Sequence, residues 1–293
     1  MQLRIVGRLL LGVLLGGVVV TGALGVGGPG PLLARVQAQA PSGSTGGAPA
    51  AGTPAVPPPP TAQAAAPIEL TGYWVSVVSE DWRWRMVTPA KGDYASVPLT
   101  LAAKTAADTW DPAKDEASGN ACRSYGAAGL MRVPTRLHIT WQDPQTLKVD
   151  TDAGMQTRLL RFGGATTAAA KAAASGPPTW QGLSLAEWEL PRRVNAVATA
   201  PVAGPPPGVG SLKVVTTRLR PGYLRKNGIP YSANTVLTEY WDLSKERNGD
   251  QWLVITTVVH DPVNLQTDYI TSPNFKKEAD GAKWDPTPCS ARW

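Results

Sequence analysis

Apolar and polar residues alternate with a period of two along much of this 293-residue chain, and this pattern constrains its fold more than any other feature. Such alternation is typical of half-buried β-strands. It is clear where Leu137, Ile139 and Trp141 alternate with polar residues, and it recurs in segments rich in β-branched and aromatic residues. We expect one helix near 99–110, and strands at 70–79, 81–87, 135–142, 146–151, 155–162, 182–190, 211–220, 235–243 and 251–260.

Turn-forming residues separate several of these segments. Asn227-Gly228, Asn248-Gly249 and Asp280-Gly281 are dipeptides that favour tight hairpins, and 152–154 is expected to join another pair of strands. The sequence therefore predicts a mainly β protein built as an antiparallel meander. Because closing a sheet into a barrel removes its exposed edges, a barrel is the preferred architecture and a β-sandwich is the alternative.

The N-terminal region differs from the rest of the chain. Arg4 and Arg8 precede an uncharged apolar run over 9–28 and small residues around Ala38, a layout typical of a secretory signal. We expect a signal peptide at 1–38 and a periplasmic or secreted mature protein. The alternative is an uncleaved helix that anchors the chain to the inner membrane, since about 20 uncharged residues can span a bilayer. That helix would then be the protein's one contact with the membrane.

Three further segments have low sequence complexity. Residues 39–67 carry no charge and consist mostly of Pro, Ala, Gly, Ser and Thr, a composition that cannot bury enough apolar surface to fold. We expect them to form a disordered linker. The segments 165–178 and 191–210 are similar and are expected to be surface loops within a single β-rich domain at 68–293.

Charge and cysteine content narrow the class of protein. The formal charge of +6 includes three arginines in the leader, so the mature chain carries about +3, too little for strong electrostatic binding of nucleic acid. An even pair of cysteines in an exported chain favours one disulfide, between Cys122 and Cys289. The alternative of two metal-binding thiolates lacks the paired C-x-x-C spacing of zinc sites.

Several short motifs carry a resemblance. The segments 122–126, 131–134, 152–158, 188–189, 230–232 and 237–239 resemble a widespread family of uncharacterised exported bacterial proteins. The opening Leu70-Thr-Gly72-Tyr-Trp74 is also similar to the G-x-W start of lipocalin-like barrels. What this resemblance implies is a lipocalin-like barrel with room for a ligand, by analogy of fold alone.

The sequence offers few groups for catalysis. His138 is expected on a polar strand face and His260 at the end of a strand, where ordinary structural roles are commoner than catalysis. Glu187 and Glu189 would share one strand face, as paired carboxylates in glycosidases can, but such pairs are also common on solvated strands. We assign no catalytic residue, no metal site and no cofactor. A hydrolytic enzyme that uses carboxylates or histidine stays the alternative.

Aromatic composition points to a binding protein instead. The chain has 11 Trp but only 2 Phe, and indole rings combined with arginine or glutamate can hold small apolar or sugar-like ligands. We therefore predict a small-ligand-binding or structural β-barrel module. A surface protein that binds a partner without a cavity is a further alternative, and the oligomeric state stays open. The expected ligand contacts are Trp74, Trp82, Trp84, Arg158, Glu189, Tyr231 and Glu239.

Overall fold

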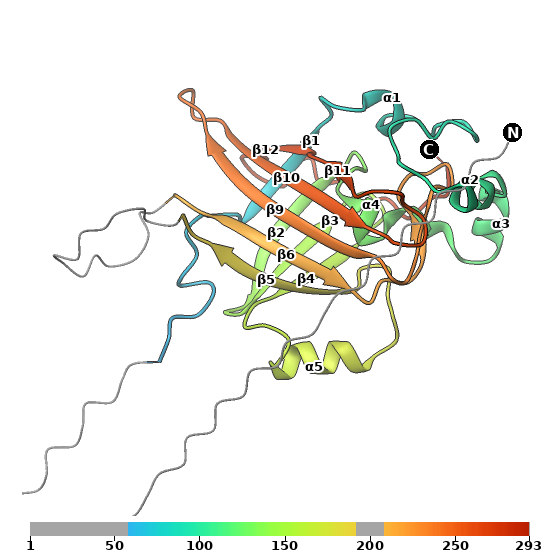
Figure 1. The fold of residues 1–293 in the computed structure, drawn as a ribbon. Coiled ribbons are helices and arrows are strands. Elements are labelled where there is room, and N and C mark those ends of the chain that lie inside the picture. Colours follow the sequence, from blue (N-terminus) through green and yellow to red (C-terminus); the bar gives the residue numbers. More distant parts are fainter. Residues whose placement is uncertain (1–57, 192–207, 293) are drawn as a thin grey trace, which may run out of the picture. The chain divides into compact units, whose positions relative to one another are not determined.

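The computed structural model describes residues 58–191 and 208–292 (Figure 1). The expected signal peptide at 1–38, most of the expected linker at 39–67 and most of the expected loop at 191–210 lie outside these ranges. The last ten residues of the linker region, 58–67, are described. There the Ala62 carbonyl accepts a hydrogen bond from Trp188 Nε1 at 2.8 Å, so this stretch packs against the domain and is not part of a disordered spacer.

The domain is a closed β-barrel, which confirms the mainly β prediction and favours the barrel over the sandwich. Nine strands follow one another around it in the order β10-β12-β1-β2-β3-β4-β5-β6-β9, and β9 pairs back with β10. These strands are β1 (Gly72–Val77), β2 (Arg136–Asp143), β3 (Thr146–Thr151), β4 (Thr157–Arg161), β5 (Leu183–Glu189), β6 (Ser211–Thr217), β9 (Val236–Lys245), β10 (Gln251–His260) and β12 (Asn274–Glu278). Burial alternates along most of them, as the period of two predicts.

One strand pair departs from the predicted antiparallel meander. β4 and β5 are parallel, with Leu160 opposite Ser184. A parallel pair needs a crossover connection, and here α5 (Ala168–Ser175) provides it. The prediction of a plain loop over 165–178 was therefore wrong. Alanine-rich composition favours the helix, and the Thr167 hydroxyl caps its start by accepting from the Ala170 amide at 3.2 Å.

The predicted strand at 81–87 was also wrong, because this segment forms α1 (Trp82–Arg85). The apolar residues Trp82 and Met86 of this segment are 66% and 54% exposed, whereas Arg85 is buried. The strand pairing also leaves the segment without a neighbour, since β1 pairs with β2 and β12. Polar contacts of the buried Arg85 help to hold this segment in place.

The C-terminal strands were missed. β11 (Tyr269–Thr271) and β12 lie end to end along β10, and β12 then pairs with β1 to close the barrel. Asn248-Gly249 joins β9 to β10 as predicted, and Asn227-Gly228 lies between the short strands β7 (Gly222–Tyr223) and β8 (Pro230–Tyr231). Asp280-Gly281 follows β12 and joins no second strand in the described ranges, so that turn was predicted wrongly.

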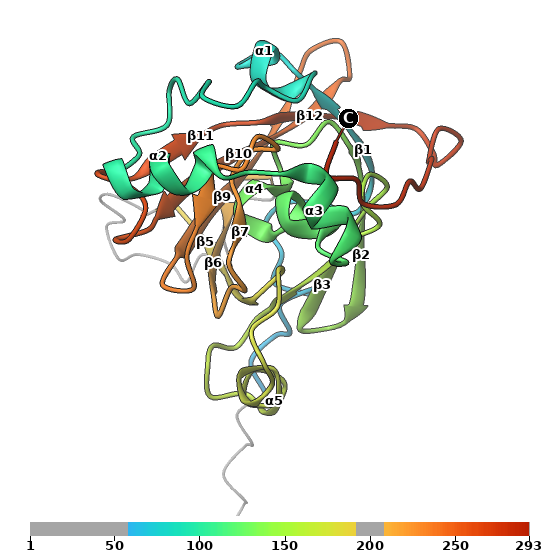
Figure 2. The same ribbon diagram turned by 90° about the vertical axis from the view of Figure 1, so that its right-hand side faces the viewer.

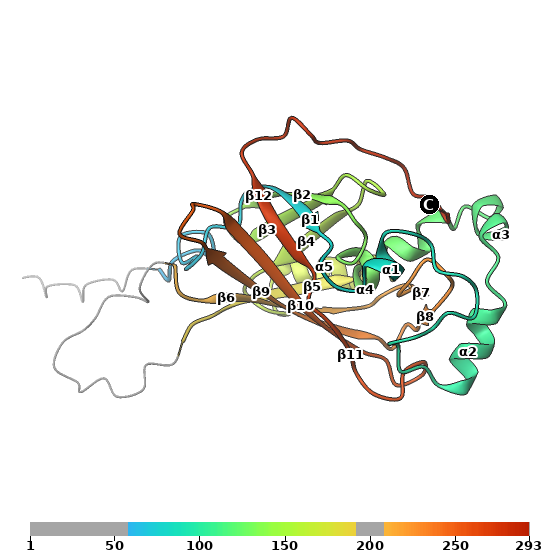
Figure 3. The ribbon, with the colours of Figure 1, turned by 90° about the horizontal axis from the view of Figure 1, so that it is seen from above.

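Side chains pack the barrel interior, where Trp74, Trp241 and Phe275 are fully buried. A second apolar cluster closes one end. The elements gathered at that end (Figures 2 and 3) are α2 (Leu101–Asp108), α3 (Pro112–Ala117), η1 (Ala121–Tyr125), α4 (Ala127–Leu130) and the β7–β8 hairpin. The helix expected at 99–110 is α2, and the other three helical elements were not predicted. Cys122 of η1 is joined to Cys289 by a disulfide, as predicted.

Candidate functional site

The residues predicted to contact a ligand do not form one site. Trp74 is buried in the barrel core, and Trp82 projects from α1 with 66% of its surface exposed. Glu189 lies at the end of β5, where its carboxylate is 3.5 Å from the Lys213 ammonium. Tyr231 is buried in the apolar cluster at the helix-covered end. The predicted contacts are thus spread over the core, the surface and both ends of the sheet.

Two of the predicted residues do meet, inside the barrel. Arg158 on β4 donates through both terminal nitrogens to the Glu239 carboxylate on β9, at 2.9 and 2.5 Å. Both side chains are fully buried. Arg158 also donates to Thr216, whose hydroxyl shares a 2.7 Å hydrogen bond with Ser184. Because the two ions satisfy each other, this pair is an internal ion pair of the barrel and leaves no charge free for a ligand.

The candidate catalytic groups also have structural partners. The His138 ring is stacked on Tyr73 with ring centroids 4.1 Å apart. His260 is exposed and its Nδ1 lies 2.8 Å from the Asp268 carboxylate. Glu187 is 65% exposed and pairs with Lys213 at 3.0 Å. No group of three or more metal-ligating side chains occurs in the described ranges.

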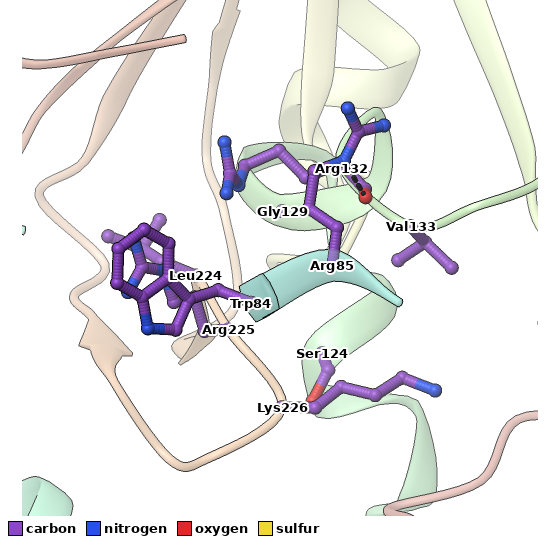
Figure 4. Close-up of a pocket in the computed structure, with 9 residues that line it drawn as sticks. All are labelled: Trp84, Arg85, Ser124, Gly129, Arg132, Val133, Leu224, Arg225 and Lys226. Carbon is purple, nitrogen blue, oxygen red and sulfur yellow. Dashed lines mark hydrogen bonds between the residues drawn. The ribbon is translucent and has the colours of Figure 1, made fainter. Parts of the chain in front are cut away.

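A different set of charged side chains gathers at the helix-covered end. Arg85 of α1, Arg132 after α4 and Arg225 in the β7–β8 turn are each at most 6% exposed and line one small pocket with Trp84 (Figure 4). We call these three arginines the arginine cluster. Arginines are rarely buried without paired carboxylates, so the balance of charge around them shows what this pocket can hold.

Two of the three arginines have a carboxylate partner. Arg85 pairs with Glu80 and also donates from Nε to the Arg132 carbonyl at 2.8 Å. Arg132 pairs with Asp81 at 3.0 Å, and its guanidinium lies 5.7 Å from the centre of the Tyr269 ring. Burial lowers the pKa of Arg85 from its ordinary value, Glu80 opposes this, and the nearby charge of Arg132 adds to it. The two arginines therefore repel each other at close range.

Arg225 is the one arginine of the cluster whose charge is not balanced by a carboxylate in the described ranges. It is 4% exposed, yet among the described residues it forms no ion pair. One terminal nitrogen donates to the Ala95 carbonyl at 2.7 Å, the other reaches the Tyr269 hydroxyl at 3.4 Å, and the guanidinium stacks 5.0 Å from the Trp84 ring. Its Nε finds no hydrogen-bond partner in the described ranges, and neither does Nη1 of Arg132. The residues that line the pocket thus carry a buried positive charge, and its arginines have two unused donors.

The turn that carries Arg225 is itself unusual, because residues 224–228 are buried although they include Arg225, Lys226 and Asn227. The side-chain amide of Asn227 donates to the carbonyls of Ala90 and Asp93, at 3.1 and 2.9 Å, and so ties the segment 90–93 to this turn. Lys226 leads away from Trp84 and Arg225 (Figure 4). Its ammonium donates to the Tyr125 hydroxyl at 2.7 Å, and burial lowers its pKa to about 8.

The pocket itself is small. Its cavity is about 20 Å³, enough for about one water molecule. As it stands, the cavity can therefore receive one oxygen atom of an anionic group, and the rest of the ligand must lie outside it. A buried positive charge with unused N–H donors favours an oxyanion, whose oxygens accept several charge-assisted hydrogen bonds at once.

Comparisons with protein-family models, with curated proteins and with solved structures found no match. In the ranges that the structure describes, no helix has the length and apolar character needed to cross a bilayer. The site must therefore be interpreted from its own chemistry. Sequence reasoning singled out Trp84 as a contact but missed Arg225, since its position in a hairpin turn predicts a solvated side chain.

Proposed function

We propose that this protein is an exported ligand-binding β-barrel module whose arginine cluster binds the anionic group of a small ligand. The observation that carries this proposal is the burial of Arg225 without a carboxylate partner among the described residues. Burying an uncompensated charge costs several kcal/mol, on the order of the whole stability of a domain. A bound anion would supply the missing charge and occupy the unused donors of Arg132 and Arg225.

The packing of the barrel also favours a ligand at its end. The large side chains of the barrel core leave little room for an apolar ligand of the kind that lipocalin-like barrels carry, and the internal ion pair is self-contained. The proposed export rests on the signal-like N-terminus and agrees with the presence of a disulfide.

The test is thermal unfolding in sodium sulfate, phosphate or acetate at constant ionic strength, for the wild type and two matched variants. Arg225→Met removes the unbalanced charge, whereas Arg83→Met removes an exposed arginine that also stacks on Trp84, at 5.2 Å. A ligand that binds only the native state, at a free concentration of 100 times its Kd, raises the free energy of unfolding by about 2.7 kcal/mol.

We expect at least one of these anions to stabilise the wild type and Arg83→Met but not Arg225→Met. Sulfate and phosphate also stabilise proteins by exclusion from their surfaces, and that effect would be the same in all three proteins. Equal stabilisation of the wild type and Arg225→Met would therefore contradict the proposal.

A further inference from the structure

A second hollow is lined by other residues of the β7–β8 hairpin. It is a cleft of about 470 Å³ between the end of α2, α3, η1 and the β7–β8 hairpin. Cavities that bind small molecules have volumes of about 300 to 1,000 Å³, so this cleft is large enough for an organic ligand. We call it the polar cleft. It shares no lining residue with the pocket of the arginine cluster.

The walls of the polar cleft are held in place before any ligand arrives. Asp115 of α3 is buried and accepts hydrogen bonds from Arg123 and from the Tyr223 hydroxyl, both at 2.9 Å. The Arg123 guanidinium also stacks 4.4 Å from the centre of the Tyr223 ring. Next to Arg123, Cys122 ties η1 to the C-terminal segment through the disulfide. A preformed cleft loses little conformational entropy when it binds.

Trp110 is one of the residues that line the cleft. This side chain packs directly on Gly228, where an added Cβ would lie 2.3 Å from the Trp110 Cβ. Gly228 also has a positive φ of +85°, so two independent constraints favour glycine there. Trp110 is only partly buried. An indole face in a wet cleft offers an apolar platform with one hydrogen-bond donor at its edge.

The charges of the polar cleft are balanced, in contrast to those of the arginine cluster. Its lining includes two basic side chains, Lys114 and Arg123, and two acidic ones, Asp111 and Asp115. Such a site gains little from an ionic ligand. Its hydrogen-bonding groups are of both kinds, since carboxylates accept and ammonium, amide and hydroxyl groups donate. The matching ligand is neutral, has an apolar face, and has several groups that both donate and accept.

We infer that the polar cleft binds a neutral saccharide the size of a mono- or disaccharide, with one face of a sugar ring on Trp110. Sugar hydroxyls are both donors and acceptors, and the C–H groups of a pyranose form an apolar face that fits an indole. Asp115 is placed to accept from the ligand, because each carboxylate oxygen already accepts one hydrogen bond and has a second lone pair. This inference stands independently of the proposed anion site.

The experiment titrates the mature protein with maltose, cellobiose and N,N′-diacetylchitobiose, using saturation-transfer NMR and calorimetry. Ala106 and Ala102 are both exposed on α2, but only Ala106 lines the cleft. Ala106→Trp therefore fills the cleft from its rim without removing any native contact, and Ala102→Trp is its matched control. Neither substitution touches the core, so both variants are expected to fold.

We expect at least one disaccharide to bind the wild type and Ala102→Trp, with affinity for Ala106→Trp reduced by about tenfold or more. Arg225→Met should bind the same sugar as the wild type does, which separates this site from the arginine cluster. The inference is overturned if none of the three sugars binds the wild type, or if Ala106→Trp binds as tightly as Ala102→Trp.

Discussion

The ion pair inside the barrel allows a quantitative test of how the interior is built. Glu239→Gln keeps the size of the side chain but removes its charge, leaving Arg158 fully buried beside a neutral amide. Removing one partner of a buried, hydrogen-bonded pair typically costs about 3 to 5 kcal/mol, because the remaining charge is uncompensated. Here we expect the upper part of that range, since both terminal nitrogens of Arg158 donate to Glu239 and its Nε has no hydrogen-bond partner in the described ranges.

Urea unfolding followed by tryptophan fluorescence, with linear extrapolation to water, measures this loss in the free energy of unfolding. Glu187→Gln is the matched control, because Glu187 is 65% exposed and solvent screens its pairing with Lys213, so its loss should change the stability little. The double variant Arg158→Met/Glu239→Leu removes both charges and should return the stability to within about 1 kcal/mol of the wild type.

Two results would refute this reasoning. A loss below about 1 kcal/mol in Glu239→Gln would mean that Arg158 reaches water or another anion when its partner is removed. If the double variant is as unstable as Glu239→Gln, the loss of stability comes from altered packing and not from an uncompensated charge.

Three other predictions concern the helix-covered end. Burial lowers the pKa of Lys226 from 10.5 to about 8, so below pH 8 the folded protein must hold a buried ammonium group, which destabilises it. We therefore expect Lys226→Met to be more stable than the wild type at pH 7, by up to about 3 kcal/mol. Between pH 8 and 10.5 Lys226 is neutral in the folded state and still charged in the unfolded state, so the stability difference between Lys226→Met and the wild type should disappear over this range. Urea unfolding at a series of pH values measures it, and a difference that does not change with pH would contradict the prediction. Replacing Cys122 and Cys289 by serine removes a cross-link between two positions that are 167 residues apart in the sequence. We expect this to lower the free energy of unfolding by about 4 to 5 kcal/mol, measured in denaturant without reductant, and a loss below about 1 kcal/mol would argue against the bond. Gly154→Ala should lower stability by about 1 to 3 kcal/mol, because its φ is +78° and a Cβ would lie 2.3 Å from the Tyr125 ring; an unchanged melting temperature would contradict this.

Much of the barrel could be predicted from local patterns. β9 and β10 each alternate clearly, and Asn248-Gly249 between them is a typical hairpin turn, so their pairing needed no long-range information. The parallel pair β4–β5 could not be predicted in this way. Its register depends on the crossover through α5, in a segment whose alanine-rich composition resembled that of the linker.

The error at 81–87 has a different physical cause. Tryptophan and arginine alternate there, but alternation shows which side chains share a face, not which face is buried. In the folded chain Trp82 is exposed and Arg85 is buried, and the Arg85 guanidinium has hydrogen-bond partners that compensate for its burial. Propensity and periodicity carry no information about such partners.

The arginine cluster could not be foreseen for a related reason. Arg85, Arg132 and Arg225 lie in three segments far apart in the sequence, and only the closed barrel end brings them together. Each of them alone resembles a solvated surface residue. What marks the cluster as a site is the count of buried charges and unused donors, which requires the three-dimensional arrangement.

The most direct test of the proposed anion site is a crystal of the protein soaked in selenate, measured at the selenium absorption edge. We predict an anomalous selenium peak beside the arginine cluster, placed so that selenate oxygens can accept hydrogen bonds from Arg132 Nη1 and Arg225 Nε, and no such peak in Arg225→Met. Anomalous density confined to exposed arginines such as Arg83, with the cluster empty, would contradict the account.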